Sequence, residues 1–435
     1  MYKIKPLENL KKEISIPPDK SISHRAAMVS SLARGKTVVA PFLMSDDTLA
    51  TLDCLKKLGI KFKLAKDATL TICAAGMHFP RKQKVQLYAK ESGTTIRILS
   101  GLLCAQKFTS VFKAAPLLRA RPMLRIITPL REMQACIKGV KRAENEYPPL
   151  TISKTKKLRS GKFKLKIASA QIKSAIMLAA LYADKPTIIR EPYQSRDHTH
   201  RMLSLFRADV AKRDRETIVN PTKKLISPRK IFIPGDFSSA AFFIVLGLIM
   251  KKSELLIKNV NVNHTRCGLL NVLERMGANI KIMNKTNDYE PYADILVKSS
   301  TLRATTVSEN EIPLMIDEIP ILCVAASFAK GRTCIFGVKE LKVKETDRIK
   351  SMVSNLKRAG VDIWGGACGL GNQGIVIGGL GALKKAKFNS FSDHRTAMSL
   401  IIFAMASGRE YALDNVKCIN KSFPEFLDVI KSLYS

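Results

Sequence analysis

Several segments of the chain place serine, threonine, lysine and arginine in what the pattern predicts to be the first turn of a helix. These are residues 20–25, 91–97, 169–173 and 391–395. The start of a helix carries unpaired N–H donors and about half a positive charge, so it attracts anions. Arginine adds a fork that binds phosphate or carboxylate. Ordinary helix capping would explain any one segment. If all of them converge, they predict a site for a ligand bearing phosphates and carboxylates.

Two further segments bring carboxylates to predicted helix starts, where acid–base chemistry becomes possible. Asp317 and Glu318 stand before an apolar stretch, and KETDR at 344–348 opens an amphipathic one. A carboxylate held among cations stays ionised, as a general base should. Capping and surface ion pairs are the structural alternative for each segment.

Nucleotide and metal motifs fail on their context. GKT at 35–37 lacks the first glycine of a P-loop, and GLGNQG at 369–374 precedes a predicted strand instead of opening a helix. The six histidines form no HExxH pattern. We therefore expect no metal and no organic cofactor.

The elements that position these residues repeat along the chain. Amphipathic helices with a capping start are predicted at 45–61, 263–281 and 345–363, and each ends at a glycine (Gly59, Gly277 or Gly360). Weaker copies lie at 121–135, 197–209 and 421–433. A second helix type is apolar on nearly all sides, which predicts burial. Its members open at Ser21, Thr94, Ser169, Ser238, Pro320 and His394. Short strands such as 164–167 and 230–233 precede several of them.

This pattern predicts an α/β fold that is duplicated into two domains, with three copies of the repeat in each half. The turn at 234–236 is the clearest boundary, and the pair at 17–18 is a second crossing point. The expected domains are therefore 18–234, and 1–17 together with 235–435.

The composition is that of a globular protein, with 46% hydrophobic and 25% charged residues among 435. We expect a cytoplasmic protein because no apolar leader is present, the most apolar stretches are too short to span a bilayer, and the nine cysteines form no CxxC pair. The net charge of +37 raises the alternative of nucleic-acid binding. Because the basic residues are spread along the whole chain, we expect neither a specific nucleic-acid partner nor a membrane.

Taken together, the segments resemble the EPSP synthase family, the 3-phosphoshikimate 1-carboxyvinyltransferases. Ten motifs match in order along nearly the whole chain: PPDKSISHR at 17–25, ESGTTIR at 91–97, LRARPM at 118–123, SAQIKSA at 169–175, SRDHT at 195–199, PGDFSSAAFF at 234–243, IDEIP at 316–320, ELKVKETDRI at 340–349, SDHRTAM at 392–398 and NKSFPEF at 420–426. The resemblance implies an inside-out α/β barrel in each of two domains, each built from three βαβαββ units with buried helices, and a monomer.

The resemblance also implies a reaction and a set of binding residues. The family adds the 5-hydroxyl of shikimate 3-phosphate to phosphoenolpyruvate and then eliminates phosphate; glyphosate inhibits it at the phosphoenolpyruvate site. The implied contacts to shikimate 3-phosphate come from Ser21, Arg25, Ser169, Gln171, Ser195, Asp317 and Lys344. Those to phosphoenolpyruvate come from Lys20, Gly93, Arg121, Gln171, Arg348, Arg395 and Lys421. Asp317 would accept the hydroxyl proton, and Glu345 with Lys20 or Lys421 would handle the proton at C3.

Four positions depart from the family pattern: Pro18, Glu91, Gln134 and His200. The family usually has Gly, Asn, Gly and Glu there, and the departures bear on affinity and pH optimum more than on the reaction. Two alternatives to this function remain. One is the sister transferase acting on UDP-N-acetylglucosamine, which uses a loop cysteine as acid, whereas Cys104 and Cys136 fall in helix-like contexts. The other is an inactive basic protein that binds nucleic acid.

Overall fold

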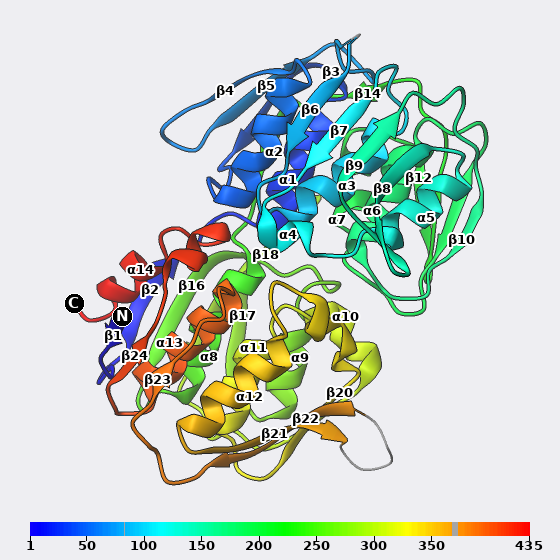
Figure 1. Cartoon of the computed structure of the whole chain (residues 1–435). Coiled ribbons are helices and arrows are strands. Elements are labelled where there is room, and N and C mark those ends of the chain that lie inside the picture. Colours follow the sequence, from blue (N-terminus) through cyan, green and yellow to red (C-terminus); the bar gives the residue numbers. More distant parts are fainter. Residues whose placement is uncertain (82, 368–372) are drawn as a thin grey trace. The chain divides into compact units, whose positions relative to one another are not determined.

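Helices that are buried on all sides pack against small sheets in both halves of the chain (Figure 1). The computed structural model describes residues 1–81, 83–367 and 373–435, so most of the glycine-rich segment at 369–374 lies outside the described residues. The chain forms two compact units. The N-terminal unit comprises residues 18–233, and the C-terminal unit comprises 1–17 and 234–435.

The N-terminal unit contains three sheets. Its helices are α1 (Lys20–Ser30), α2 (Asp46–Lys57), α3 (Gly93–Leu103), α4 (Pro116–Arg119), α5 (Leu124–Glu132), α6 (Ala170–Ala180) and α7 (His198–Leu205). Its strands are β3 (Ala33–Ala40), β4 (Lys61–Leu64), β5 (Leu70–Ala74), β6 (Val85–Tyr88), β7 (Ser110–Lys113), β8 (Cys136–Arg142), β9 (Asn145–Ser153), β10 (Lys162–Lys164), β11 (Thr187–Arg190), β12 (Val210–Arg213), β13 (Glu216–Val219), β14 (Leu225–Ile226) and β15 (Lys230–Phe232).

The C-terminal unit repeats this plan. Its helices are α8 (Phe237–Ile249), α9 (Gly268–Arg275), α10 (Ile312–Met315), α11 (Ile319–Ser327), α12 (Arg348–Arg358), α13 (His394–Ala406) and α14 (Phe426–Ser432), with 3₁₀ turns η1 (Glu309–Glu311), η2 (Val338–Val343) and η3 (Lys417–Lys421). Its strands are β1 (Tyr2–Ile4), β2 (Lys11–Ser15), β16 (Glu254–Asn261), β17 (Asn279–Thr286), β18 (Tyr292–Lys298), β19 (Thr306–Val307), β20 (Thr333–Phe336), β21 (Val361–Ala367), β22 (Gln373–Leu380), β23 (Lys387–Phe388) and β24 (Tyr411–Leu413).

One strand order recurs in these sheets, as in β6-β7-β9-β8 and β19-β20-β22-β21. Two parallel strands are joined through a buried helix, and an amphipathic helix then leads into an antiparallel hairpin. The first sheet of the N-terminal unit takes its leading strands, β14 and β15, from the far end of that unit.

The expected α/β class with buried helices is confirmed, and the structure adds detail on how its sheets are built. The described strands form separate open sheets, and none of them closes into a barrel. The last repeat of the C-terminal unit has only three strands, β1-β24-β23, because the N-terminal strand β1 pairs antiparallel to β24 where a hairpin was expected. The expected strand at 164–167 instead spans Lys162–Lys164, since its partner β11 ends at Arg190.

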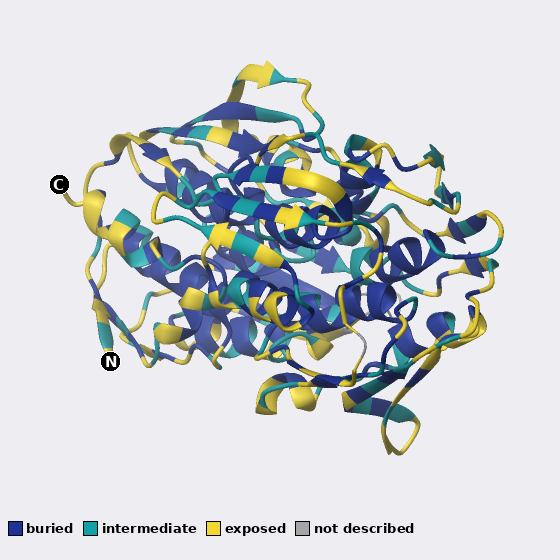
Figure 2. Cartoon of the chain, turned by 90° about the horizontal axis from the view of Figure 1, so that it is seen from above, coloured by how far each residue is buried: buried dark blue, intermediate teal, exposed yellow. Residues whose placement is uncertain are grey.

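The six apolar helices are present, and each begins within two residues of its expected start. Three of them begin at an aspartate that accepts backbone N–H groups: Asp19 for α1, Asp236 for α8 and Asp393 for α13. The starts predicted from the sequence, Ser21, Ser238 and His394, lie one or two residues after these aspartates. Figure 2 shows the buried residues gathered along these helices.

The amphipathic helices end as their glycines predict. Gly59, Gly277 and Gly360 have φ angles of +90°, +84° and +94°, the left-handed conformation that glycine adopts without strain. Gln134 and Arg207 take the equivalent place after α5 and α7, with φ of 64° and 60°. Among the described residues, no helix is both long and apolar enough to cross a membrane.

Candidate active site

Arg25 is the centre of a buried polar group in the N-terminal unit. Its Nε donates to Oγ1 of Thr199 at 2.6 Å, and its Nη2 donates to Oγ of Ser174 at 2.9 Å. Its Nη1 donates to the carbonyl of Ser21, one helical turn earlier, at 2.9 Å. These bonds connect α1 with α6 and α7, and they hold the guanidinium in one orientation.

A second group surrounds Gly93, the first residue of α3. Arg97 donates from Nη1 to Oε1 of Gln171 at 2.8 Å, and Gln171 donates from Nε2 to Oγ1 of Thr94 at 3.1 Å. A Cβ atom on Gly93 would lie 3.1 Å from Nη1 of Arg97 and 3.3 Å from Nη1 of Arg121. Glycine therefore leaves space beside two guanidinium groups at a helix start, which suits a carboxylate or phosphate.

Lys20 opens α1, and its Nζ lies 3.1 Å from Oδ2 of Asp47. On the same helix, Nδ1 of His24 hydrogen-bonds Oγ1 of Thr51 at 2.7 Å. Burial, helped by the nearby charges of Lys20 and Arg25, holds the pKa of His24 well below its ordinary value of 6.5. His24 is therefore neutral, and the positive charge at this helix start resides on lysine and arginine.

Ser169 and Ser195 lie at opposite ends of one polar cluster around α6. Ser169 is the N-cap of α6, and its Oγ accepts the N–H of Ile172 at 3.5 Å. Ser195 donates its hydroxyl to Glu191, which also accepts Nζ of Lys173 at 2.5 Å. Because this ion pair is buried, it fixes the loop that carries Ser195.

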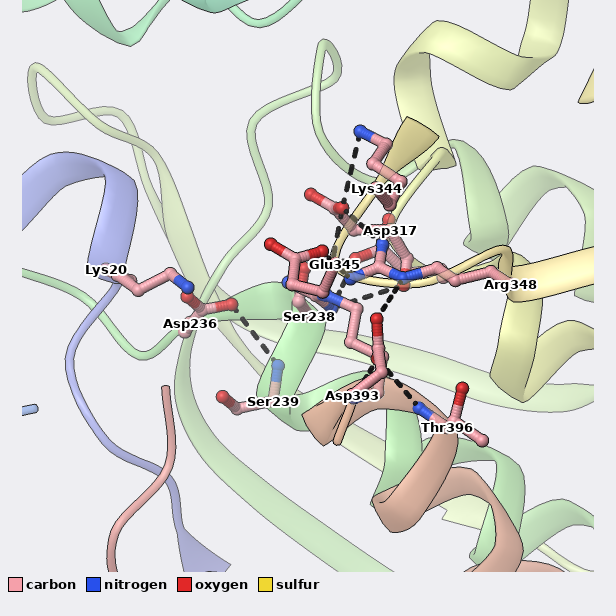
Figure 3. Close-up of polar contacts among 12 residues, drawn as sticks. Lys20, Asp236, Ser238, Ser239, Asp317, Lys344, Glu345, Arg348, Asp393 and Thr396 are labelled. Carbon is pink, nitrogen blue, oxygen red and sulfur yellow. Dashed lines mark hydrogen bonds and ion pairs between the residues drawn. The ribbon is translucent and has the colours of Figure 1, made fainter. Parts of the chain in front are cut away.

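In the C-terminal unit, Arg348 binds three carboxylates at once (Figure 3). Its Nε lies 2.9 Å from Asp393, its Nη1 lies 3.1 Å from Asp317, and its Nη2 lies 2.8 Å from Glu345. Burial opposes the charge on this guanidinium. Attraction by the three carboxylates outweighs burial, so the pKa of Arg348 is raised above its ordinary value.

Asp317 faces further cations besides Arg348. Nε of Arg395 lies 3.7 Å from its Oδ1, and Nζ of Lys344 lies 4.0 Å from the same atom. Arg395 also donates from Nη1 to the carbonyl of Asp317 at 3.2 Å. Oδ1 of Asp317 is thus oriented by three positive groups, in a carboxylate that is only partly buried.

Glu318, the residue after Asp317, is fully buried and contacts polar side chains from three other segments. It accepts the hydroxyl of Ser238, and its Oε1 lies 3.7 Å from Nη1 of Arg395 and 4.0 Å from Nη1 of Arg266. Arg266 in turn lies 2.9 Å from the helix-capping Asp236. This buried network connects Arg395 with Glu318, and so holds the segment that carries Asp317.

The contacts therefore join most of the predicted residues within each unit. Lys421 is one residue that is not joined: it ends η3, and among the described residues no hydrogen bond or ion pair joins it to Asp317, Glu345 or Arg348. Sequence reasoning missed several members of these groups. They are Asp47, Arg97, Ser174, Glu191, Thr199, Arg266 and Asp393. Arg97 and Asp393 lie inside motifs that were recognised, so their charge was the available signal.

Of the four departures from the family pattern, the structure explains the one at Glu91. Glu91 accepts the backbone N–H groups of Leu117 and Leu118 at 3.3 and 2.8 Å, so its charge caps the start of α4. Gln134 occupies a left-handed position that glycine fits better. Burial, the largest influence, lowers the pKa of His200 although Asp197 opposes it. Pro18 stands directly before the capping Asp19 of α1.

The helix-like context expected for Cys136 is wrong. Cys136 begins strand β8, because α5 has already ended at Glu132, whereas Cys104 does cap the end of α3. Burial raises the pKa of the Cys104 thiol. Within the described part of the chain, no three His, Cys, Asp or Glu side chains come together as a metal site requires. The arrangement is one of arginines, lysines and carboxylates, which can bind anions and move protons.

Comparison with known proteins agrees with this chemistry. The family described as EPSP synthase (3-phosphoshikimate 1-carboxyvinyltransferase) matches residues 4–430. The 3-phosphoshikimate 1-carboxyvinyltransferase of Petrotoga mobilis is 45% identical over 433 residues, covering 99% of both chains. That of Citrifermentans bemidjiense is 43% identical over 437 residues, again covering 99% of both. The structure of EPSP synthase from Acinetobacter baumannii superposes with a TM-score of 0.85 at 36% identity, covering 99% of this chain and 97% of that one.

Proposed function

The chain belongs to the EPSP synthase family, and on that premise we propose that it transfers the enolpyruvyl group of phosphoenolpyruvate to the 5-hydroxyl of shikimate 3-phosphate. The products are 5-enolpyruvylshikimate 3-phosphate and phosphate, in the route to chorismate and the aromatic amino acids. The observation that carries the proposal is the position of Asp317, whose Oδ1 faces Arg348, Arg395 and Lys344. It combines a proton acceptor with cations that bind anionic substrates.

Phosphoenolpyruvate carries a phosphate and a carboxylate, and both match the guanidinium groups of the site. In the N-terminal unit, the space at Gly93 beside Arg97 and Arg121 suits one such anion. We assign its binding to Lys20, Gly93, Arg121, Gln171, Arg348, Arg395 and Lys421. Of these, Lys421 has the weakest geometric support, because no contact joins it to the rest of its group among the described residues.

Shikimate 3-phosphate brings a second phosphate, a carboxylate and hydroxyl groups. The guanidinium of Arg25 is fixed by three hydrogen bonds, and the hydroxyl of Ser195 is fixed by Glu191. Side chains held in this way bind a ligand without losing further side-chain freedom, with the remaining N–H groups of Arg25 as donors and the Ser195 oxygen as an acceptor. We assign the binding of shikimate 3-phosphate to Ser21, Arg25, Ser169, Gln171, Ser195, Asp317 and Lys344.

The reaction proceeds by addition and elimination. Asp317 accepts the proton of the 5-hydroxyl while that oxygen bonds to C2 of phosphoenolpyruvate, and C3 receives a proton. The tetrahedral intermediate then loses a proton from C3 and expels phosphate, which leaves the enol ether. Glu345, with Lys20 or Lys421, handles the proton at C3. The arginines stabilise the phosphate charge throughout, so no metal or organic cofactor is needed.

The two units correspond in this proposal to the two enolpyruvyl transferase domains, 18–234 and 1–17 with 235–435. We also propose that the protein works as a monomer in the cytoplasm and has neither a nucleic acid nor a membrane as a specific partner. The test of function below includes a nucleotide-sugar acceptor, because the sister transferase acts on UDP-N-acetylglucosamine.

The test is phosphate release from phosphoenolpyruvate by the purified protein and by Asp317→Asn, an isosteric change that removes the proton acceptor. We expect release only when shikimate 3-phosphate is also present, and a loss of about 10²–10⁴-fold in kcat for the variant. The matched control is Asp428→Asn, because Asp428 is exposed and its carboxylate pairs with the exposed Lys431 on the surface. Phosphate release that occurs with UDP-N-acetylglucosamine but not with shikimate 3-phosphate as the acceptor would refute the assignment. Full activity of Asp317→Asn would also refute it.

A further inference from the structure

A cavity of about 1230 Å³ opens in the N-terminal unit where α3 and α6 end. It is lined by Cys104 and Leu181, the residues that cap the C-terminal ends of these two helices. Gly93 and Gln171 of the candidate site stand in the first turns of the same helices. Because α3 has 11 residues, it is about 16 Å long at 1.5 Å per residue. The cavity is therefore separate from the proposed substrate site.

The lining of this cavity is strongly basic. Loops from all three repeats of the unit contribute exposed lysines together with Arg34, and these are Lys107, Lys154, Lys156, Lys157, Lys223 and Lys224. The lining contains no aspartate or glutamate. Within the described part of the chain, none of these seven side chains forms an ion pair with a carboxylate.

Helix ends cannot account for this much positive charge. The C-terminal end of a helix carries about half a negative charge, so α3 and α6 together attract about one cation. Seven exposed cations line the cavity, which leaves a large positive potential at its opening. An anion of several charges would relieve their mutual repulsion.

The floor of the cavity is less polar than its rim. Buried Cys104 and Gln106 lie there, and Tyr182 donates its hydroxyl to the carbonyl of Met77. The ring of His78 lies 5.6 Å from the ring of Tyr182. Exposed lysines beside the rings of His78 and Tyr182 suit a compact ligand that carries several phosphates. A hollow of this size fits a small molecule better than the long, aromatic-studded groove that single-stranded nucleic acid requires.

We propose that this cavity binds a small polyphosphorylated anion, such as inorganic tripolyphosphate or a nucleoside triphosphate. The site is independent of the transferase reaction proposed above. The lysines of the 154–157 and 223–224 loops hold the ligand. Tripolyphosphate and a nucleoside triphosphate both carry a chain of phosphates, which would face these unpaired cations.

The test is a calorimetric titration with tripolyphosphate at near-physiological salt. The cavity variant is Lys156→Gln, Lys157→Gln, Lys223→Gln and Lys224→Gln combined. The control variant is Lys251→Gln, Lys252→Gln, Lys384→Gln and Lys385→Gln, which removes the same charge from exposed lysines of the C-terminal unit. We expect one saturable site that weakens at least about tenfold in the cavity variant and less than about twofold in the control.

Additional measurements identify the ligand and distinguish a failure of this proposal from a failure of the proposed transferase function. Tighter binding of a nucleoside triphosphate than of tripolyphosphate would show that the base adds contacts on the floor, and equal binding would assign the site to the phosphates alone. Burial, with Lys107, lowers the pKa of His78, so a bound polyanion should raise that pKa in an NMR titration. Both variants should keep the wild-type rate of phosphate release.

Three results would overturn the proposal. One is no saturable binding of either ligand by the wild type. Another is an equal loss in the two variants, which would mean that only the net charge matters. The third is tighter binding of duplex DNA than of either small anion, lost in the cavity variant and falling steeply with salt, because this would identify a nucleic-acid surface instead.

Discussion

Asp393 both caps the start of α13 and binds the guanidinium of Arg348. Its Oδ1 accepts the N–H groups of Arg395 and Thr396 at the start of α13, while its Oδ2 accepts Nε of Arg348. One carboxylate thus fixes the start of the helix that carries one proposed phosphoenolpyruvate ligand and orients a second ligand. A helix cap is often regarded as a purely structural feature, but here it also holds a charged side chain of the candidate site.

His24 makes the stability of the N-terminal unit sensitive to acid. Its pKa is lowered in the folded chain, so below about pH 6.5 the unfolded chain binds a proton that the folded chain does not. The free energy of unfolding should therefore fall as the pH drops through the unfolded-state pKa of about 6.5. His24→Gln should flatten that part of the profile, measured by urea unfolding at several pH values.

The control for this prediction is His78→Gln. His78 is exposed, and its pKa is lowered less strongly. That variant should retain most of the pH dependence. An unchanged slope in His24→Gln, or a stability that rises as the pH falls through this range, would contradict the role assigned to the buried imidazole.

At the scale of elements, α3 and α6 approach so closely that their contact requires a glycine. A Cβ atom on Gly101 would lie 2.1 Å from the carbonyl oxygen of Ala175, which is backbone and cannot swing away. Gly101→Ala should thus force the two helices apart and lower the free energy of unfolding by about 1–3 kcal/mol or more. Thermal and urea unfolding would measure the change.

The direction in which Gly101→Ala changes the free energy of unfolding serves as a control for this prediction. Alanine inside an unobstructed helix normally stabilises it by about 0.5–1 kcal/mol relative to glycine. Stabilisation by Gly101→Ala would therefore show that α3 and α6 are not held in close contact. Because the helices carry Gly93 and Gln171 at their other ends, a drop in activity should accompany the loss of stability.

Helices were easier to predict from the sequence than the bounds of strands or the pairing between strands. An apolar run such as 240–250 is long enough to identify a buried helix, and Gly59, Gly277 and Gly360 marked helix ends through their left-handed geometry. Two of the aspartate caps, Asp19 and Asp236, were missed because a serine that offers the same chemistry follows each of them two residues later. The extent of β10 was missed because a strand ends where its partner ends, and sequence periodicity does not show the partner.

The candidate site could be predicted only in part for a similar reason. Local motifs identified the charged residues at helix starts, including Arg25 and Arg348, but not which of them touch. Arg266 lies 30 residues along the chain from Asp236, the side chain that it contacts, and no local pattern marks it. Long-range contacts of this kind depend on the packing of whole repeats.

At the scale of the whole molecule, the net charge of +37 is the dominant electrostatic feature. Lysines and arginines outnumber carboxylates by 73 to 36, so about half of the cations have no carboxylate of their own. Their repulsion opposes the compact state more than the unfolded one, in which the same charges lie farther apart. A protein with balanced charge gains little from screening, whereas this one should gain stability.

We therefore expect the midpoint of thermal unfolding to rise by a few degrees as sodium chloride increases from about 10 to 300 mM, because the screening length shrinks from about 30 Å to below 8 Å. Chloride is the appropriate anion, since phosphate or sulfate could also bind at the arginines and at the basic cavity. An equal osmolarity of glucose, which carries no charge, controls for effects on water. A midpoint that falls with added salt would mean that attractive ion pairs such as Arg348 with its three carboxylates outweigh the repulsion of the surplus cations.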